Sequence, residues 1–297
     1  MACGHPPSLQ AEGGHTGTLL HSALTAAPRP QPTNPEPDES TLRSSHEDVD
    51  ILPESCVLCE AFYTSFVQLS EVGVESLEHA TRHQSDSSLW HMARRLRITA
   101  STASVIPKLA KTSTENASQT LVNPQFRGNA ATAHGIKNEP VARKKFIEVT
   151  GLTVGSSGTV VCQGRPWLSA SPDGLITSHN AILEIKCPNV LNCKEYIARG
   201  GYDVRIKDGI YFLPKTTGFY SQVQLCMLCT ETKLCFLYVW SAEEEVSLLV
   251  KFDEAFLNEN LARLERFYFC QMLPELERRC REGIIVISSE YRQLCAM

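Results

Sequence analysis

Two short β-rich segments joined by three turn residues are the feature of this sequence that most constrains its fold. The segments and the link between them are Gly174–Thr177, Ala181–Lys186 and the turn Ser178–Asn180. A hairpin with so short a link holds its two strands side by side. Because side chains alternate along a strand, Glu184 and Lys186 are expected on one face and Ile185 on the other. The carboxyl group of Asp173 is then expected beside them.

This pairing of an acidic residue with a Glu-x-Lys strand is the Pro-Asp…(Asp/Glu)-x-Lys pattern of metal-dependent nucleases. The carboxylates of Asp173 and Glu184, with the backbone carbonyl of Ile185, form an all-oxygen ligand set of the kind that Mg²⁺ prefers. Lys186 can orient or deprotonate an attacking water and stabilise negative charge that develops on phosphorus. A hairpin can also carry such residues on a solvated face, so the pattern alone leaves both interpretations open.

The distribution of charge along the chain bears on the choice between these interpretations. The formal net charge is −5, which is unusual for a protein that binds a polyanion. However, residues 82–215 contain 18 Lys and Arg against 9 Asp and Glu, whereas residues 1–60 contain 2 against 9. The attraction of a phosphate decays over roughly 10 Å at physiological salt, so the local excess decides. The candidate ligands all lie in the basic block.

Composition also suggests how the chain is divided. The first 50 residues are rich in proline and poor in large apolar side chains, so they cannot offset the entropy of ordering. We expect a disordered acidic leader at 1–55, a short helical entry segment at 56–86, the main globular domain at 87–283 and a C-terminal tail at 284–297.

The same composition favours an intracellular protein. No run of eighteen apolar residues predicts a membrane helix, and the N-terminus lacks the basic and apolar regions of a secretory signal. Several of the 12 cysteines lie in apolar runs, as reduced cysteines do. Nothing in the sequence distinguishes the nucleus from the cytoplasm, and no membrane partner is expected.

Apolar periodicity and capping residues predict helices and strands in alternation. Helices are expected at Ala61–Leu69, Val74–Arg82, Ser88–Arg95, Thr99–Ile106, Asn129–Thr150, Gly218–Thr230 and Asp253–Cys280. Further strands are expected at Thr153–Gly155, Gly158–Cys162, Trp167–Ala170, Leu234–Trp240 and Val246–Phe252. Lys111–Pro124 is polar and predicts a loop, and Pro140 predicts a kink or a late start of its helix. The pattern indicates an α/β (α+β) fold with a central mixed β-sheet flanked by helices.

Five motifs occur in a fixed order over about residues 75–270. They are Trp90-x-x-x-Arg94 with Ile98–Ser101, Gly135–Arg143, Ser169–Leu175, Leu183–Pro188 and Tyr220–Gln224. In this order they resemble the motifs of the phage lambda exonuclease family, the YqaJ-type viral recombinases, so the domain at 87–283 resembles a nuclease of that family. The resemblance implies a restriction-endonuclease-like core.

The resemblance also implies roles for residues outside the hairpin. Glu139 matches the first acidic metal ligand, so that Glu139, Asp173, Glu184 and the Ile185 carbonyl would hold Mg²⁺, with Mn²⁺ as a substitute. Gln222 matches an active-site glutamine that would assist Lys186. Arg94 and Ser101 match the residues that bind the 5′ phosphate at a DNA end.

Two further arginines are candidates for contacts to the DNA backbone. Arg97 lies two residues after Arg95, and Arg143 lies one turn after Glu139. Either side chain can contact phosphate or simply face solvent, and the sequence leaves both interpretations open. Trp90 and Trp167 are expected in the core rather than stacked on bases.

From these roles we expect a Mg²⁺-dependent exonuclease that digests double-stranded DNA from its ends, 5′→3′, in recombination or repair. The resemblance implies a homotrimer and a single-strand annealing protein as a partner. One alternative is an endonuclease of the same superfamily, structure-specific or non-specific, which would lack the pocket of Arg94 and Ser101. Another is a catalytically inactive DNA-binding relic, which would have lost a ligand or Lys186.

A zinc site is a separate hypothesis for the entry segment. Cys56-x2-Cys59 and His79-x3-His83 supply four ligands of the two types that zinc fingers use, but the 19 residues between the pairs exceed the usual spacing of a finger. The alternative is a pair of ordinary entry helices.

Overall fold

The computed structural model describes residues 56–108, 112–123 and 129–297, so the expected leader lies outside the described residues. Its helices, including the short 3₁₀ and π segments labelled η, are α2 (Val57–Phe66), α3 (Glu71–Ala80), η1 (Gln84–Asp86), α4 (Ser88–Arg95), η2 (Ala103–Val105), α5 (Glu115–Val122), α6 (Ala130–Thr150), η3 (Thr177–His179), α7 (Cys193–Ala198), α8 (Gly218–Cys229), α9 (Glu254–Phe267), η4 (Tyr268–Met272), α10 (Leu273–Arg281) and α11 (Ser289–Cys295). Its strands are β1 (Ile98–Thr99), β2 (Val160–Val161), β3 (Leu168–Ala170), β4 (Gly174–Ile176), β5 (Ala181–Lys186), β6 (Arg205–Lys207), β7 (Ile210–Phe212), β8 (Leu234–Trp240) and β9 (Glu245–Lys251).

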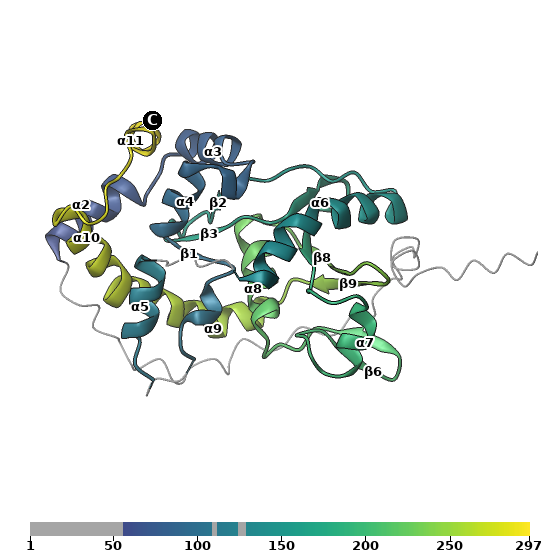
Figure 1. Cartoon of the computed structure of the whole chain (residues 1–297). Helices are drawn as coiled ribbons and strands as arrows, with labels where there is room; N and C mark the ends of the chain where they lie inside the picture. The colour runs from purple at the N-terminus through teal and green to yellow at the C-terminus, as the bar shows by residue number, and fades with distance from the viewer. Residues whose placement is uncertain (1–55, 109–111, 124–128) are drawn as a thin grey trace, which may run out of the picture. The chain divides into compact units, whose positions relative to one another are not determined.

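A four-stranded mixed sheet in the order β4-β5-β8-β9 forms the centre of the domain (Figure 1). The hairpin β4–β5 is antiparallel, β5 and β8 are parallel, and β8–β9 is antiparallel. The parallel pair requires a crossover, which α7, the hairpin β6–β7 and α8 provide. The predicted mixed α/β fold with a sheet flanked by helices is therefore confirmed.

The two faces of this sheet are covered by different helices. On β8, the rings of Phe236 and Tyr238 pack against Phe146 of α6, with centroids 5.9 and 5.3 Å apart. Glu184 of β5 pairs in register with Leu237, which alternates with those two rings and so lies on the opposite face. Helix α8 contacts β5 and β8. Glu184 therefore lies on the face that α8 covers.

The predicted helix at Thr99–Ile106 is wrong. Ile98 and Thr99 form strand β1, which pairs with β3 in a small sheet ordered β1-β3-β2, and only Ala103–Val105 makes a short 3₁₀ turn. The hydroxyl of Thr102 accepts a hydrogen bond from the Thr99 backbone N–H at 3.1 Å. Side-chain hydrogen bonds of this kind offer the backbone an alternative to a helix. The segment therefore turns where apolar spacing alone favours a helix.

Three other predicted elements also differ from the structure. The expected loop at Lys111–Pro124 contains helix α5, which buries Ala117 and Leu121 in the core. Helix α6 continues through Pro140 without interruption, begins at the Asn129 cap and ends at Gly151, whose φ of 69° suits a glycine. The helix expected at Asp253–Cys280 is divided into α9 and α10 by the π segment η4, in which Tyr268 is buried and donates to the Leu96 carbonyl at 2.9 Å.

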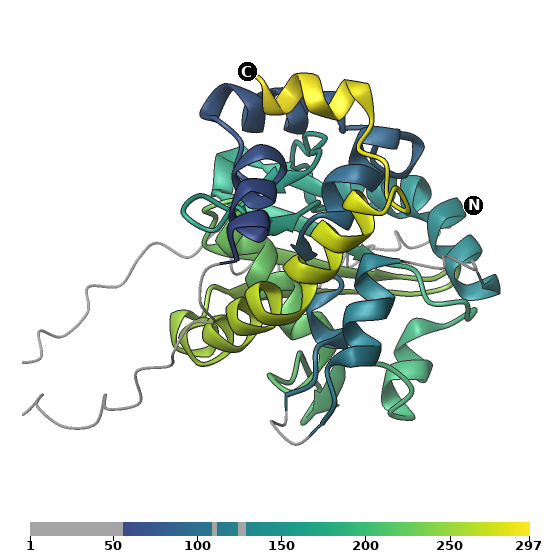
Figure 2. The same ribbon diagram turned by 90° about the vertical axis from the view of Figure 1, so that its left-hand side faces the viewer.

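The C-terminal residues form a packed helix. Helix α11 contacts α2, α3 and α4, and Figure 2 shows it beside α3. Its Tyr291 is fully buried, and the Tyr291 hydroxyl donates to the Phe66 carbonyl at 3.0 Å. The beginning and the end of the described chain thus share one core. Among the described residues, no helix has the length and apolar character needed to cross a bilayer.

Candidate active site

The hairpin β4–β5 opens at the point where Asp173 stands. Strand β4 pairs with β5 only from Gly174, which lies opposite Leu183. Beyond that pair, the Asp173 Oδ2 atom accepts the backbone N–H of Ile185 at 2.6 Å, in place of a carbonyl from the sheet. A Cβ at Gly174 would lie 2.3 Å from the Val154 side chain, so only glycine allows this approach. Local chain geometry therefore fixes the carboxyl group of Asp173 against β5.

Three polar side chains meet on the α8 face of β5. The Lys186 ammonium donates to Glu184 Oε1 at 2.7 Å and to Gln222 Oε1 at 3.3 Å. Gln222 in turn donates its amide N–H to the same Glu184 oxygen. Glu184 is only 2% exposed and Lys186 is 18% exposed, so this is a nearly buried ion pair. The structure brings together the residues that the Glu-x-Lys pattern and the glutamine motif predicted.

Burial and the charges within this cluster shift the pKa values of its side chains. Burial raises the pKa of Asp173 well above its usual value, and the negative charges of Glu184 and Glu139 raise it further. Burial opposes protonation of Lys186, but Glu184 and Asp173 outweigh it and raise the pKa of that ammonium. The carboxyl groups of Glu139, Asp173 and Glu184 therefore all lie within electrostatic range of Lys186.

Helix α8 directs Gln222 toward this cluster. The other two polar residues of the motif, Tyr220 and Gln224, hold the helix in this orientation by bonding to the end of β9 and the start of α9. The hydroxyl of Tyr220 donates to Asp253 Oδ2 at 2.7 Å, and Gln224 accepts the Asp253 backbone N–H at 2.8 Å. Gln224 also donates to the Lys251 carbonyl at 2.8 Å. Sequence reasoning identified the motif but not this anchor, since Asp253 lies some thirty residues away. The only local indication was the alternation of polar residues in an otherwise apolar helix.

Glu139 and Arg143 lie on helix α6, one turn apart. Both are half-buried. Burial raises the pKa of Glu139; Arg143 lowers it, and Glu184 raises it, so these groups lie within electrostatic range of one another. A Cβ at Gly174 would stand 3.3 Å from an Arg143 guanidinium nitrogen, which places Arg143 beside the opening at Asp173. Arg143 therefore lies at the edge of the carboxylate cluster rather than on a remote surface.

Arg94 and Ser101 are also brought together. An Arg94 guanidinium nitrogen donates to the Ser101 hydroxyl at 2.9 Å, and the guanidinium carbon lies 4.1 Å from the centre of the Trp90 ring. The Trp90 indole N–H donates to Ser171 at 3.0 Å, two residues before Asp173. Burial lowers the pKa of Arg94 to about 10, and the charge of Glu184 acts in the opposite direction. This pair therefore borders the same cluster. Trp90 is half-buried and supports Arg94, whereas Trp167 lies in the core as predicted.

Arg97 does not face a ligand, which corrects the expectation that it contacts DNA or solvent. Its side chain is 1% exposed. Its guanidinium donates to the carbonyls of Pro166, Ala93 and Val67 and to the Tyr291 hydroxyl, at 2.7–3.0 Å. A buried arginine with four internal acceptors has a structural role: it joins α2, α4, α11 and the loop before β3. The partners lie far apart in sequence, so charge patterning could not reveal this role.

The residues of the cluster fit a hard cation in chemistry and charge. Glu184 Oε2 is buried and has no hydrogen-bond partner among the described residues, so a buried carboxylate oxygen is left unsatisfied. The negative charges of Glu139 and Glu184 raise the pKa of Asp173, and that of Glu184 raises the pKa of Glu139, so the three carboxyl groups lie within electrostatic range of one another. Within residues 56–108, 112–123 and 129–297, however, no three His, Cys, Asp or Glu side chains stand close enough together to form a ready-made metal site.

The same result bears on the zinc hypothesis. In the described part of the chain, Cys56, Cys59, His79 and His83 do not assemble into a cluster of three or more ligands. Cys59 is buried in the core, whereas Cys56 is exposed. The four residues occupy or flank α2 and α3, which pack as ordinary helices, and zinc is not proposed.

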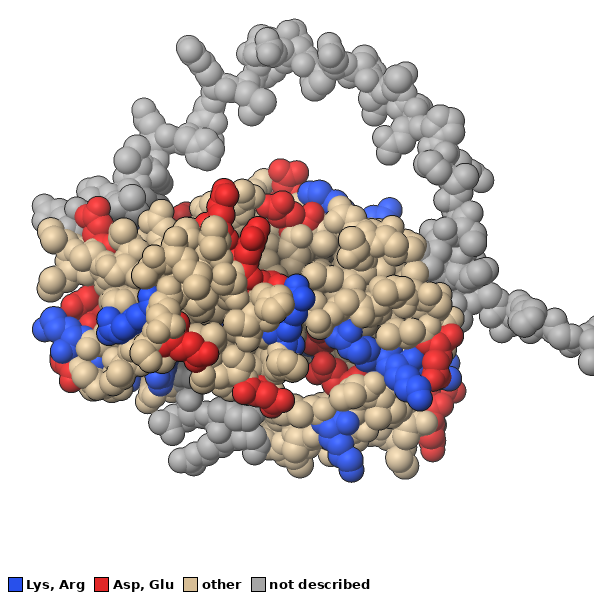
Figure 3. All heavy atoms as spheres, turned by 90° about the horizontal axis from the view of Figure 1, so that it is seen from above, with Lys and Arg blue, Asp and Glu red and all other residues tan. Residues whose placement is uncertain are grey.

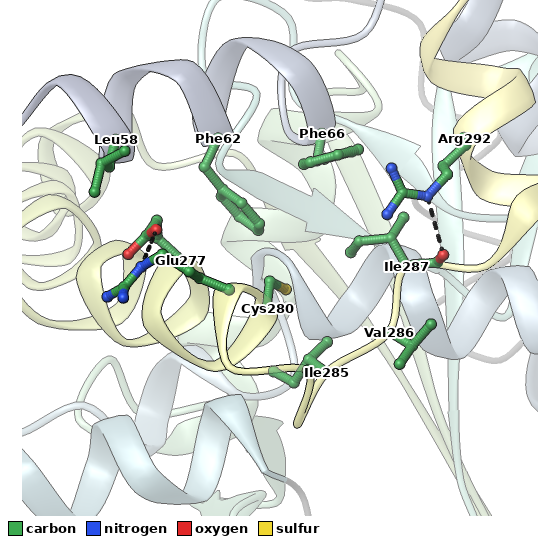
Figure 4. A pocket seen from close by; sticks show the side chains of 11 residues that line it. Leu58, Phe62, Phe66, Glu277, Cys280, Ile285, Val286, Ile287 and Arg292 are labelled. Carbon is green, nitrogen blue, oxygen red and sulfur yellow. Dashed lines mark hydrogen bonds and ion pairs between the residues drawn. The ribbon is translucent and has the colours of Figure 1, made fainter.

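A cavity of about 330 Å³ lies elsewhere, between α2, the end of α10 and the segment leading to α11 (Figure 4). Its lining combines apolar side chains, among them Phe62 and Ile285, with the charged side chains of Glu277, Arg281 and Arg292. None of the sequence-predicted site residues lines it. Figure 3 shows basic and acidic side chains mixed over the face it draws, so no uniform basic surface covers that face.

Comparisons with known proteins agree with this geometry. Residues 89–233 match the model of the YqaJ-like viral recombinase domain. The chain is 26% identical to the crystal structure of an alkaline exonuclease, LHK-Exo, from Laribacter hongkongensis, with a TM-score of 0.52 over 67% of this chain and 98% of that chain. A structure of LHK-Exo in complex with dAMP is 25% identical, with a TM-score of 0.50 over 65% and 96% of the two chains. No curated protein matches the chain.

Proposed function

Because residues 89–233 form a YqaJ-like viral recombinase domain, we propose that this protein is a metal-dependent exonuclease that digests DNA from duplex ends. The observation that carries the proposal is the buried Lys186–Glu184 ion pair, held by Gln222 beside the carboxyl group of Asp173. A buried ion pair contributes little to the free energy of folding, because removing its charges from water offsets their attraction. A buried lysine among three carboxyl groups is therefore typical of a functional site. The exonuclease structures of similar fold support the reaction class.

Glu139, Asp173, Glu184 and the carbonyl of Ile185 would hold the cation, Mg²⁺ or Mn²⁺ in its place. When bound, the cation neutralises phosphate charge and lowers the pKa of a coordinated water. The unsatisfied Glu184 Oε2 and the closeness of Glu184 and Glu139 to Asp173, whose pKa they raise, support this ligand set.

Lys186 acts as a hydrogen-bond donor rather than as a base. Its pKa is raised by Glu184 and Asp173, so the ammonium stays protonated at neutral pH. A protonated Lys186 can donate to the attacking water or to a non-bridging phosphate oxygen on which negative charge develops. Gln222 holds Glu184 Oε1 and accepts from Lys186, and thereby fixes the direction of the ammonium.

Arg94 and Ser101 would hold the terminal 5′ phosphate of the strand. A guanidinium stacked on Trp90 keeps donors directed toward Ser101, and arginine is well suited to bind phosphate in this way. Holding the terminal phosphate at a fixed distance from Lys186 sets the position of cleavage. Digestion from that end proceeds 5′→3′.

Incubation with Mg²⁺ and labelled DNA tests the proposal. A linear duplex with a 5′ phosphate should be shortened from its ends, whereas a closed circular duplex should remain intact. Cleavage of the closed circle would instead support an endonuclease of the same superfamily. Binding of both substrates without cleavage, in Mg²⁺ and in Mn²⁺, would leave the inactive relic as the explanation.

A further inference from the structure

The hairpin β6–β7 exposes large apolar side chains beside basic ones. Ile210 is 61% exposed and Phe212 is 41% exposed, and both belong to the second strand of a two-stranded sheet. The opposing strand contributes Arg205 and Lys207. A group of exposed apolar side chains bordered by polar ones is typical of a binding site.

The register shows that these four residues share one face. Arg205 pairs with Phe212, and Lys207 pairs with Ile210, while the intervening pair points to the other face. Lys207 has no ion-pair partner among the described residues, and Arg205 donates only to a neighbouring backbone carbonyl. One face therefore combines two apolar side chains with two cations that no carboxylate neutralises. We call Arg205, Lys207, Ile210 and Phe212 the hairpin face.

Both ends of the hairpin are fixed next to the active-site cluster. Before β6, the Tyr202 ring packs on Phe219 with centroids 5.3 Å apart, and Asp203 accepts the Phe219 backbone N–H at 3.2 Å. Lys186 lies 4.9 Å from the centre of the same Phe219 ring. After β7, the chain enters α8 at Gly218, where a Cβ would stand 3.5 Å from Ser104, close to Ser101 in sequence. The hairpin is thus rooted between Lys186 and the Ser101 loop.

We propose that the hairpin face binds unpaired bases and phosphates of the DNA strand near the cluster, with Phe212 stacked on a base. Single-strand sites combine aromatic side chains that stack on bases with cations that follow the backbone. Duplex DNA hides its base faces, so a stacking side chain favours unpaired nucleotides. The inference rests on the proposed nuclease function and adds a specificity for unpaired nucleotides beside the duplex end.

Binding in EDTA, without cleavage, tests the proposal independently of catalysis. The probe is a single-stranded oligodeoxynucleotide that carries 2-aminopurine, measured by fluorescence anisotropy and by the quenching that stacking causes. Phe212→Ala should weaken binding about 5–10-fold and reduce the quenching. Phe212→Trp should retain both. Lys207→Ala should weaken binding and lower its salt dependence, but leave the quenching at saturation unchanged.

Matched controls separate this effect from loss of structure. Val286 is 72% exposed on the distant cavity rim, so Val286→Ser removes an exposed apolar side chain without touching the hairpin face. It should bind as the wild type does. Wild-type affinity and quenching in Phe212→Ala, with an unchanged thermal midpoint, would overturn the proposal. So would an equal loss of affinity for a hairpin-ended duplex that has no unpaired base at its stem. Lack of cleavage by the wild type in Mg²⁺, with the binding differences intact, would refute only the proposed nuclease function.

Discussion

The Lys186 ammonium lies 2.7 Å from Oε1 of Glu184, a carboxylate that is 2% exposed. Both residues belong to β5 and are two positions apart, so strand alternation alone brings their side chains to one face. What holds the pair in place is Gln222 from α8, which contacts both partners. The ion pair is therefore local in sequence, but its orientation depends on a helix some thirty-five residues further on.

Lys186→Ala should abolish cleavage while DNA binding is retained. Loss of the donor that stabilises developing charge should lower the rate by a factor of about 10²–10⁴. Gel-shift binding and single-turnover cleavage measure the two effects separately. Because Glu184 would be left buried without its partner, the thermal midpoint should also be measured, and Lys186→Gln serves as a second variant that keeps a donor.

Lys194→Gln is the matched control for that experiment. Lys194 forms an ion pair with Glu244 at 2.7 Å, but both side chains are well exposed. Its substitution should leave the cleavage rate within about twofold of the wild type, since exposed ion pairs contribute little. Full cleavage activity in both Lys186 variants would refute the proposed role of the ammonium.

Asp173→Asn should have opposite effects on the stability of the protein without and with Mg²⁺. Without metal, the neutral side chain removes a carboxyl group whose pKa is raised by burial, Glu184 and Glu139, so the unfolding midpoint should rise or stay level. The amide oxygen can still accept the Ile185 N–H. With metal at ten times its Kd, the wild type should gain about 1.4 kcal/mol, and the variant should lose most of that gain.

Differential scanning calorimetry with and without Mg²⁺ measures both effects. Asp208→Asn is the control, because Asp208 lies in the exposed hairpin turn at φ 50°, a conformation that asparagine tolerates. Asp208→Asn should be stabilised by Mg²⁺ as much as the wild type. If Mg²⁺ stabilises Asp173→Asn equally, the cation binds elsewhere.

Arg94→Ala should remove the preference for 5′-phosphorylated ends. A charged hydrogen bond to phosphate contributes roughly 10–100-fold in affinity, so the ratio of rates on 5′-phosphate and 5′-hydroxyl ends should fall toward one. Ser101→Ala should lower the same ratio by less, because it removes a neutral partner of Arg94. Initial rates on two otherwise identical duplexes measure the ratio.

An arginine remote from the site completes the comparison. Arg281→Ala, on α10, should leave the ratio unchanged, because Arg281 is 57% exposed and pairs with Glu277 on the same helix. If Arg94→Ala digests both ends with the wild-type preference, the end-binding role and the inferred 5′→3′ direction lose their support.

The parts of the fold that sequence predicted well depend on short-range patterns. The hairpin β4–β5 follows from alternation and a turn at Asn180, whose φ of 46° suits asparagine. Strands β8 and β9 and helix α8 follow from apolar periodicity over six or more residues. Where the period is clear and the turn residues agree with it, tertiary contacts reinforce the local preference.

The parts that sequence predicted poorly depend on partners far along the chain. Thr99 joins a strand because Ser169 stands beside it, seventy residues away, and nothing local to Thr99–Ile106 reveals that pairing. Arg97 is buried because Tyr291 and three backbone carbonyls accept its N–H groups. A charged residue among other arginines gives no local indication of such partners.

The candidate site shows the same division. Asp173, Glu184 and Lys186 could be predicted from spacing, and Gln222, Arg94 and Ser101 from ordered motifs. The anchor formed by Tyr220 and Gln224 on Asp253 could not, although it decides which face Gln222 presents. The hairpin face was missed as well, because its three-residue strands are too short for a periodic pattern.

Glu275→Gln should destabilise the protein at neutral pH and have a smaller effect in acid. Glu275 is 16% exposed and accepts hydrogen bonds from Arg278 and Arg279, which lower its pKa to about 2 against burial. A carboxyl whose folded pKa is depressed contributes stability above its unfolded pKa of about 4.5. That contribution is lost as pH falls from about 4.5 to about 2. The expected loss at pH 7 is about 1–2 kcal/mol, because the partly exposed arginines are screened by solvent.

Urea unfolding at pH 7, 4 and 3 measures this difference, and Glu277→Gln on the same helix is its control. Glu277 is 12% exposed but accepts from Arg281 alone, whose side chain is 57% exposed and therefore screened by solvent, so the substitution should cost less than about 0.5 kcal/mol at each pH. The difference between the free energies of unfolding of the two variants should therefore be largest at pH 7 and decrease steadily toward pH 3. A difference in free energy of unfolding that is constant with pH would mean that Glu275 acts through packing at the α10 surface and not through its two arginines.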